Sequence, residues 1–259
     1  MVAVILLLLR QYKLTAFFQA MASTSGLSLS DKTPAPTPIG AIDELPPVLQ
    51  QQKQLTYKQR VAILKQEANL AALESPQNLT VLAGNSLSDW FPADLLPSER
   101  TWLNQGIAGD TSAGLLRRLH LFDRTQPETI FVMIGINDLL RGVTDETILE
   151  NQQQIVRYLR RVHPNSQIVV QSILPHSGEQ SSAVSNARIR QLNRQLKAIA
   201  LAEDVTYLDL HPLFTDAQGN LRADLSSDGL HLNSQGYLVW RSALQMYYSH
   251  LEMEARTDN

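Results

Sequence analysis

The sequence of 259 residues contains no cysteine, which excludes disulfide bonds, thiolate metal sites and a cysteine nucleophile. It also lacks a strong charge of either sign, since 22 Lys and Arg stand against 25 Asp and Glu. The net charge of -3 gives no long-range attraction for polyanions, so nucleic acid is not expected as a partner. Neither a lysine-containing phosphate loop nor a histidine pair with zinc-binding spacing occurs. With 44% hydrophobic residues, however, the chain can form a large packed core.

No apolar run is long enough to cross a membrane, which takes about 20 residues. The run from Val2 to Leu9 is followed by Arg10 and Lys13. Small residues at 20–22 are typical of a signal-peptidase site, but a signal peptide carries its basic residues before the apolar run. Two interpretations of residues 1–22 therefore stay open. They are a signal or anchor segment of an exported or envelope-associated protein, or a mis-assigned start in front of a cytoplasmic one.

The rest of the chain divides into three parts. Residues 23–54 are rich in Pro, Ser and Thr, a composition that sustains neither helix nor strand and is typical of a linker. Residues 55–78 hold an N-terminal helix and its connection to the main domain, because apolar residues such as Leu64 and Ala68 recur at helical spacing. The main domain spans residues 79–252.

Short apolar runs alternate with helix-length periodic segments throughout the main domain. This alternation predicts βαβ units, and therefore an α/β protein in which helices cover both faces of a five-stranded parallel sheet, a three-layer α/β/α sandwich. Ligands bind beyond the carboxyl ends of the strands in such sheets, so functional residues should follow each run directly. The predicted strands are Leu79–Ala83, Thr101–Leu103, Thr129–Ile134, Gln167–Ile173 and Val205–Leu208, and the clearest helices are 112–123, 145–162, 185–202 and 234–250.

Ser86 stands directly after the first predicted strand. A serine at the start of a helix can be held for nucleophilic attack, but it is more often a simple helix cap. A near repeat of the surrounding motif at residues 26–31 follows no apolar run and precedes the linker, so it is set aside. The motif is not the nucleophile elbow of α/β-hydrolases, because Ser88 occupies the place of their second glycine.

Two further strand ends carry candidate hydrogen-bond donors. Gly106 and Gly109 permit positive φ and would expose backbone N–H groups in a concave turn. An ordinary loop capped by Thr111 or Ser112 fits the same residues. Asn137 follows the third strand, where its amide can project into the crevice as a donor, although a turn-forming Asn-Asp pair is an equal alternative.

Asp228 and His231 lie three residues apart near the C-terminus. At this spacing the carboxylate can bond one imidazole nitrogen and leave the other free to act as a base. The other five histidines have no such companion, and we assign them structural roles.

In this order, each at its own strand end, the motifs resemble the four sequence blocks of the GDSL/SGNH hydrolase family over about residues 79–250. The resemblance implies the SGNH hydrolase fold, a flavodoxin-like sheet of order 2-1-3-4-5, and hydrolysis of esters. The segments 172–175 and 186–193 resemble most the branch that contains the platelet-activating-factor acetylhydrolase alpha subunits. The four blocks are Gly84-Asn85-Ser86-Leu87, Asn104-Gln-Gly106-Ile-Ala-Gly109-Asp110-Thr111, Gly135-Ile136-Asn137-Asp138 and Asp228-Gly229-Leu230-His231.

The resemblance implies a role for each matched residue. Ser86 is the expected nucleophile of an acyl-enzyme mechanism, with His231 as general base and Asp228 orienting the imidazole. The backbone N–H groups of Ser86 and Gly109, with the side chain of Asn137, would form the oxyanion hole. By analogy with the acetylhydrolase branch we expect short-chain acyl esters, above all acetyl esters, as substrates, and neither a metal nor an organic cofactor.

The expected partner is a small acyl ester, with membrane association through the N-terminal segment as a further expectation and no indication of oligomeric state. Leu87 and Trp90 lie just beyond the nucleophile and are candidates for the acyl pocket, although packing of the following helix accounts for them equally well. One residue departs from the family pattern, since Asn85 stands where the family usually has Asp. The alternative function is therefore a catalytically weak relative that binds acylated glycan or lipid. A flavodoxin-like binding module is the third interpretation.

Overall fold

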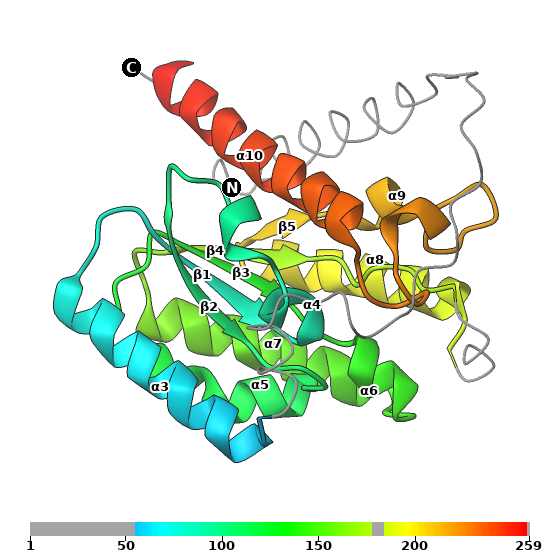
Figure 1. The fold of residues 1–259 in the computed structure, drawn as a ribbon, viewed down its shortest axis with the longest axis horizontal. Coiled ribbons are helices and arrows are strands. Elements are labelled where there is room, and N and C mark those ends of the chain that lie inside the picture. Colours follow the sequence, from blue (N-terminus) through cyan, green and yellow to red (C-terminus); the bar gives the residue numbers. More distant parts are fainter. Residues whose placement is uncertain (1–54, 178–183, 258–259) are drawn as a thin grey trace.

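The structure is a computed structural model that describes residues 55–177 and 184–257. The predicted signal or anchor segment and the linker therefore lie outside the described residues. Five parallel strands form one sheet in the order β2-β1-β3-β4-β5 (Figure 1), which confirms the predicted fold class and strand order. The strands are β1 Leu79–Gly84, β2 Thr101–Gly106, β3 Thr129–Met133, β4 Gln167–Gln171 and β5 Thr206–Leu208.

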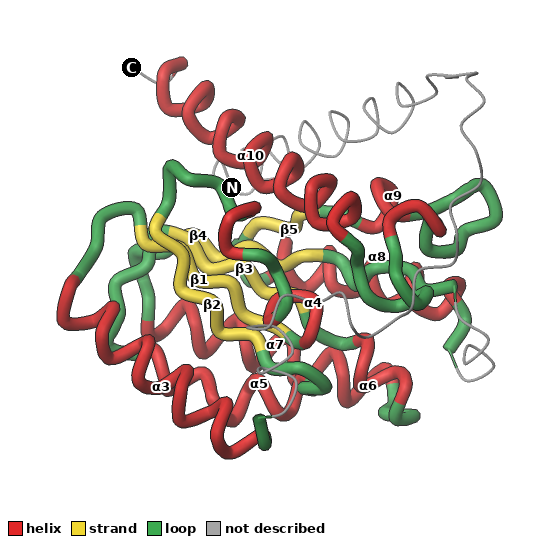
Figure 2. Tube along the Cα trace, viewed as in Figure 1, coloured by secondary structure: helices red, strands yellow, loops and turns green. Residues whose placement is uncertain are grey.

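Helices cover both faces of this sheet (Figure 2). Helices α5, α7 and α8 pack against one face, and the long C-terminal α10 crosses the other. Within the described ranges, no helix is both long and apolar enough to cross a membrane. The helices are α3 Tyr57–Glu74, α4 Ser86–Asp89, α5 Ser112–Arg118, α6 Ile136–Leu140, α7 Asp145–Val162, α8 Asn186–Ala202, α9 His211–Phe214 and α10 Ser234–Thr257, with 3₁₀ helices at Ala93–Leu95, Leu119–Phe122 and Ala223–Leu225.

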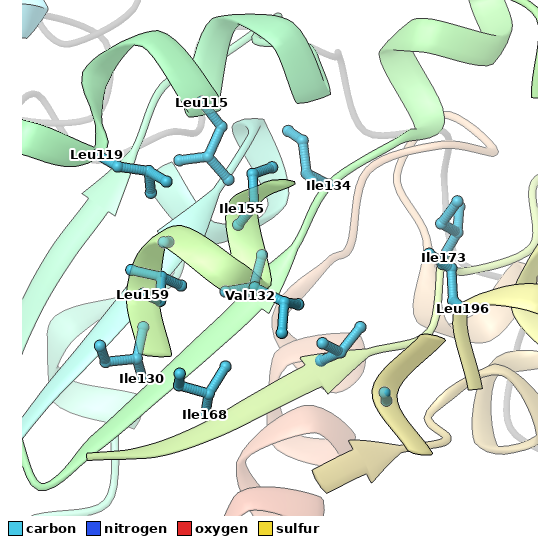
Figure 3. Close-up of a cluster of buried hydrophobic side chains, with 14 of the residues drawn as sticks. Leu115, Leu119, Ile130, Val132, Ile134, Ile155, Leu159, Ile168, Ile173 and Leu196 are labelled. Atoms are coloured by element: carbon cyan, nitrogen blue, oxygen red, sulfur yellow. The ribbon is translucent and has the colours of Figure 1, made fainter. Parts of the chain in front are cut away.

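Alternate residues of the central strands pack into two separate apolar layers. In β3, Ile130 and Val132 belong to the layer beneath α5 and α7 (Figure 3), whereas Phe131 and Met133 belong to the layer beneath α10. All four side chains are buried, and each contributes about 1.5–3 kcal/mol to folding. Because both faces of the sheet are covered, the strands appear in the sequence as nearly continuous apolar runs.

Strand β2 is longer than predicted. The apolar run that predicted it ends too early, because the second half of the strand is polar. The Nδ2 of Asn104 donates to the backbone oxygen of Ser88 at 2.5 Å, and the Nε2 of Gln105 donates to the backbone oxygen of Leu64 at 3.3 Å. These backbone oxygens accept hydrogen bonds from the two polar side chains that follow Leu103, where the predicted apolar run ended. The carboxyl end of β2 is thereby fixed beside α3 and α4.

Candidate active site

Ser86 is the first residue of α4, directly beyond β1. The helix cap is Asn85, whose Oδ1 accepts a hydrogen bond from the backbone N–H of Leu87 at 3.0 Å. The Ser86 hydroxyl instead forms a hydrogen bond with Nε2 of His231 at 3.1 Å. The alternative in which Ser86 is merely a capping residue is therefore wrong, since the residue before it performs that role.

His231 lies in the loop between the 3₁₀ helix Ala223–Leu225 and α10. Its Nδ1 is 2.7 Å from Oδ2 of Asp228, which leaves Nε2 directed at Ser86. The other carboxylate oxygen of Asp228 accepts the backbone N–H groups of Leu230 and His231, at 3.0 and 2.7 Å. Although partial burial raises the pKa of Asp228, these hydrogen bonds outweigh it and lower the pKa below its usual range. Asp228 thus stays ionised and fixes the imidazole.

Trp90 packs against the imidazole of His231, with ring centroids 4.4 Å apart and the planes tilted by 38°. Sequence reasoning placed Trp90 in an acyl pocket or in the core of the following helix. The structure places it against the ring of His231, the predicted general base. No pattern in the sequence signals this contact, because residues 90 and 231 meet only through the tertiary fold.

The predicted oxyanion donors meet at one edge of the sheet. Strands β2, β1 and β3 are neighbours, and their last residues are in register. Gly109, Ser86 and Asn137 follow these three strand ends by three, two and four residues, so the fold brings together what the sequence separates. The segments that carry the three predicted donors therefore leave the sheet at the same edge.

The two glycines of the second block have different functions. Gly109 adopts a φ of 76°, as predicted, so its position favours glycine for conformational reasons. Gly106 does not adopt positive φ, which corrects the prediction. It is required for close packing instead, because a Cβ there would overlap the backbone of Asp89 in α4.

Asn137 lies in the first turn of α6 and its amide faces the loop that carries Gly109. The Nδ2 atom donates to the backbone oxygen of Asp110 at 2.9 Å. A side-chain amide has two N–H groups, so the second is available to a ligand. Arg141, one turn further along, donates from Nη2 to the backbone oxygen of Gly109 at 2.7 Å. Asn137 is thus a loop-positioning amide, and the alternative of a simple Asn-Asp turn is wrong.

A small cavity of about 10 Å³ is lined in part by Asn85 and Leu87, the two residues that flank Ser86. Leu87, predicted for the acyl pocket, contributes to its wall. Ile136 and Leu230 also line it, and sequence reasoning missed both, although each lies directly before a predicted site residue. The full lining consists of Asn85, Leu87, Met133, Ile134, Ile136, Ile173, Leu174, Pro175 and Leu230.

Asn85, the residue that departs from the family pattern, keeps the hydrogen bond that a carboxylate would accept there. Its Nδ2 is buried and has no hydrogen-bond partner within the described part of the chain. The substitution therefore preserves the cap of α4 and adds an unpaired donor at the wall of the cavity. This geometry does not disturb the hydrogen bond between Ser86 and His231.

A parallel α/β sandwich with a Ser–His–Asp hydrogen-bonded chain at the carboxyl edge of its sheet has the architecture of a hydrolase. The family model described as GDSL-like lipase/acylhydrolase matches residues 74–239, and the chain belongs to this family. The family assignment made from the four sequence blocks is thereby confirmed, and ester hydrolysis is the activity of the family as a whole.

Individual relatives share part of the chain. The N-acylneuraminate cytidylyltransferase of Streptococcus agalactiae is 27% identical over 152 residues, which cover 58% of the chain and 35% of that protein. The platelet-activating factor acetylhydrolase IB subunit alpha2 of Gallus gallus is 30% identical over 140 residues, which cover 52% of the chain and 58% of that protein. These matches span about one third and three fifths of the lengths of the two relatives.

A solved structure of a Streptococcus pneumonia protein named after platelet activating factor has a TM-score of 0.67 and 26% identity to the chain. The match covers 77% of this chain and 97% of that one. Together with the Gallus gallus relative, it confirms the predicted similarity to the platelet-activating-factor acetylhydrolase branch.

Proposed function

We propose that the protein is a serine esterase that hydrolyses short-chain acyl esters, above all acetyl esters, through an acyl-enzyme on Ser86. The observation that carries the proposal is the continuous hydrogen-bonded chain from Ser86 Oγ to His231 Nε2, at 3.1 Å, and from His231 Nδ1 to Asp228 Oδ2, at 2.7 Å. This arrangement activates a hydroxyl nucleophile without a metal or an organic cofactor.

Acylation begins when Ser86 Oγ attacks the carbonyl carbon of the ester and His231 Nε2 accepts the hydroxyl proton. Asp228 holds the proton on Nδ1 and stabilises the imidazolium that forms. As the tetrahedral intermediate collapses, the bond to the leaving alkoxide breaks and His231 donates the proton to it. Water then attacks the acyl carbon and loses a proton to the same imidazole. The bond to Ser86 Oγ breaks, His231 returns the proton to that oxygen, and the acyl group leaves as a carboxylic acid.

The negative charge of both tetrahedral intermediates falls on the former carbonyl oxygen. The donors for this oxyanion are the backbone N–H groups of Ser86 and Gly109 and the second N–H of the Asn137 side chain. The positive φ of Gly109 and the hydrogen bond between Asn137 and the Asp110 carbonyl support this assignment, since both fix the loop before substrate arrives.

The small cavity beside Ser86 supports a preference for acetyl. Its volume of about 10 Å³ has room for one group the size of a water or a methyl. Three of the lining residues, Leu87, Ile136 and Leu230, are apolar and would suit the methyl of an acetyl group. Longer chains would have to displace these packed side chains, which costs free energy.

The test is turnover of p-nitrophenyl acetate, butyrate and octanoate by the full-length protein, with an organophosphonate as a covalent probe. We expect hydrolysis of the acetate above all, labelling of Ser86, and loss of both in Ser86→Ala. Ser88→Ala is the matched control, because that neighbouring hydroxyl is buried and makes no contact with His231. We also expect Leu230→Ala to raise the relative rate for butyrate, because it enlarges the cavity.

Two results would contradict the proposal. Full activity in Ser86→Ala would show that Ser86 is not the nucleophile. A folded wild-type protein without turnover or labelling would support the alternative of a catalytically weak, ligand-binding relative. A wild-type preference for octanoate would contradict the short-acyl specificity alone.

A further inference from the structure

Helix α3 brings a buried cation beneath the candidate active site. Figure 1 shows α3 running beside β2 at the edge of the sheet. Arg60, in its first turn, is only 7% exposed, and its Nη2 lies 2.7 Å from Oδ1 of Asp89. Asp89 is equally buried, so the two charges form an ion pair inside the protein. Arg60 precedes residue 74, where the match to the family model begins.

Asp89 connects the nucleophile to the oxyanion loop. It is the last residue of α4, the four-residue helix that begins with Ser86. Its second oxygen, Oδ2, accepts the backbone N–H of Ala108 at 3.1 Å. Ala108 directly precedes Gly109, whose N–H is one of the proposed oxyanion donors. One carboxylate therefore sets the distance between the helix that carries Ser86 and the loop that carries Gly109.

Two further contacts attach α3 to the same loop. The backbone oxygen of Leu64 accepts the Nε2 of Gln105 at 3.3 Å, and the Leu64 side chain packs with Ile107 in a small apolar cluster. The segment from Gln105 to Ala108 is thus held by α3 through a hydrogen bond, an apolar contact and the Arg60–Asp89 pair.

We propose that Arg60 is a positioning residue for catalysis, which fixes the Asp89 carboxylate so that the Gly109 N–H stays aligned with the oxyanion. The inference rests on the proposed function and deepens it, since it makes α3 part of the catalytic unit.

The physical reason lies in the burial of Asp89. Burial raises the pKa of this carboxyl, and the Arg60 guanidinium is the largest of the influences that lower it. Without Arg60 the charge would be buried and uncompensated, and the carboxylate would take up a proton or turn toward solvent. Either change weakens the bond to Ala108 and releases the loop, and a displacement of about 1 Å can cost on the order of 10²-fold in rate.

A purely structural ion pair would lower stability but leave the catalytic rate of the folded protein intact. The test is therefore kcat and KM for p-nitrophenyl acetate in full-length Arg60→Ala, at a temperature where circular dichroism shows it folded. We expect kcat to fall by about 10- to 100-fold with little change in KM, because the donor acts in the transition state. Ala68→Gly is the matched control. It weakens α3 at a buried position without touching Asp89, and kcat should be unchanged.

Chemical rescue adds a readout that stability alone would not move. A groove of about 570 Å³, open to solvent, reaches Arg60 and Asp89 between α3 and β2. Guanidinium at millimolar concentration should enter the space left by Arg60→Ala and restore part of kcat, whereas urea at the same concentration should not. Arg60→Lys should retain more activity than Arg60→Ala.

Should Arg60→Ala fail to fold, Arg60→Met/Asp89→Leu carries the test, because it leaves no buried charge unpaired. Its kcat should also fall, since Ala108 loses its acceptor. A folded variant of either kind with wild-type kcat, or an equal loss in Ala68→Gly, would overturn the inference while leaving the esterase proposal intact. Absence of turnover and of Ser86 labelling in the wild type would instead contradict the esterase proposal itself.

Discussion

The side-chain amide of Asn137 has two N–H groups, and the proposed mechanism gives each a different acceptor. One N–H donates to the Asp110 carbonyl, and in the proposed mechanism the other donates to the substrate oxygen. A residue in this position contributes little to binding the ground-state carbonyl and much to binding the oxyanion.

We predict that Asn137→Ala lowers kcat by about 10²–10³ and leaves KM nearly unchanged, as expected when one oxyanion donor is removed. Steady-state kinetics with p-nitrophenyl acetate measure both values. Asn151→Ala is the control, because it removes an amide that donates to Ser112 Oγ, outside the Ser86–His231–Asp228 chain. An unchanged kcat in Asn137→Ala would remove this residue from the oxyanion hole.

Helix α5 depends on a carboxylate from a different element for its first turn. Asp138 of α6 is 1% exposed and accepts the backbone N–H of Ser112 at 2.8 Å and its hydroxyl at 2.6 Å. Burial raises the pKa of Asp138, whereas the hydrogen bonds from Ser112 lower it. The Asp138 carboxylate faces the N-terminus of α5, the positive end of that helix dipole, so the two helices stabilise each other.

We predict that Asp138→Ala lowers the free energy of unfolding by about 1–3 kcal/mol, because the Ser112 N–H becomes buried without an acceptor. Urea unfolding at pH 7 measures the change. Ser112→Ala removes only the hydroxyl and should cost less. Equal losses in the two variants would show that the backbone N–H does not need the carboxylate.

Stability of the whole molecule should depend on pH through its buried histidines. His163 is the C-cap residue of α7, is 5% exposed and stacks on Phe122 with ring centroids 5.5 Å apart. Burial lowers its pKa below the usual 6.5, against the opposing influence of Asp123. The unfolded chain therefore binds a proton at higher pH than the native protein, so the free energy of unfolding falls as pH falls below about 6.5.

Between pH 7.5 and 5.5 we predict that the free energy of unfolding falls less in His163→Gln than in the wild type. The difference should be at most about 1.4 kcal/mol, the value for one proton over one pH unit. Urea unfolding at the two pH values measures the difference, and contributions from the buried carboxyl groups cancel in the comparison. His120→Gln is the control, because His120 is exposed in the native protein. An identical pH dependence in His163→Gln and the wild type would contradict the prediction.

The sequence by itself determined the order of elements and the four active-site blocks. Short continuous apolar runs and helices with period 3.6 reflect local burial, so β1, β3 and α7 could be located from the pattern alone. Ser86, Asn137 and His231 could be selected because each follows a strand end or has a companion at fixed spacing, which are also local signals.

Only the tertiary structure decided which side chains meet across elements. Arg60 and Asp89 are 29 positions apart, and the contact of Trp90 with His231 and the polar half of β2 likewise depend on strand order and helix packing. A buried charge or an amide in a strand looks unfavourable in isolation, because its partner is absent from the local sequence. The fold supplies that partner, which is why the sequence locates Ser86 as the candidate nucleophile and the structure alone shows which side chains contact the segments around it.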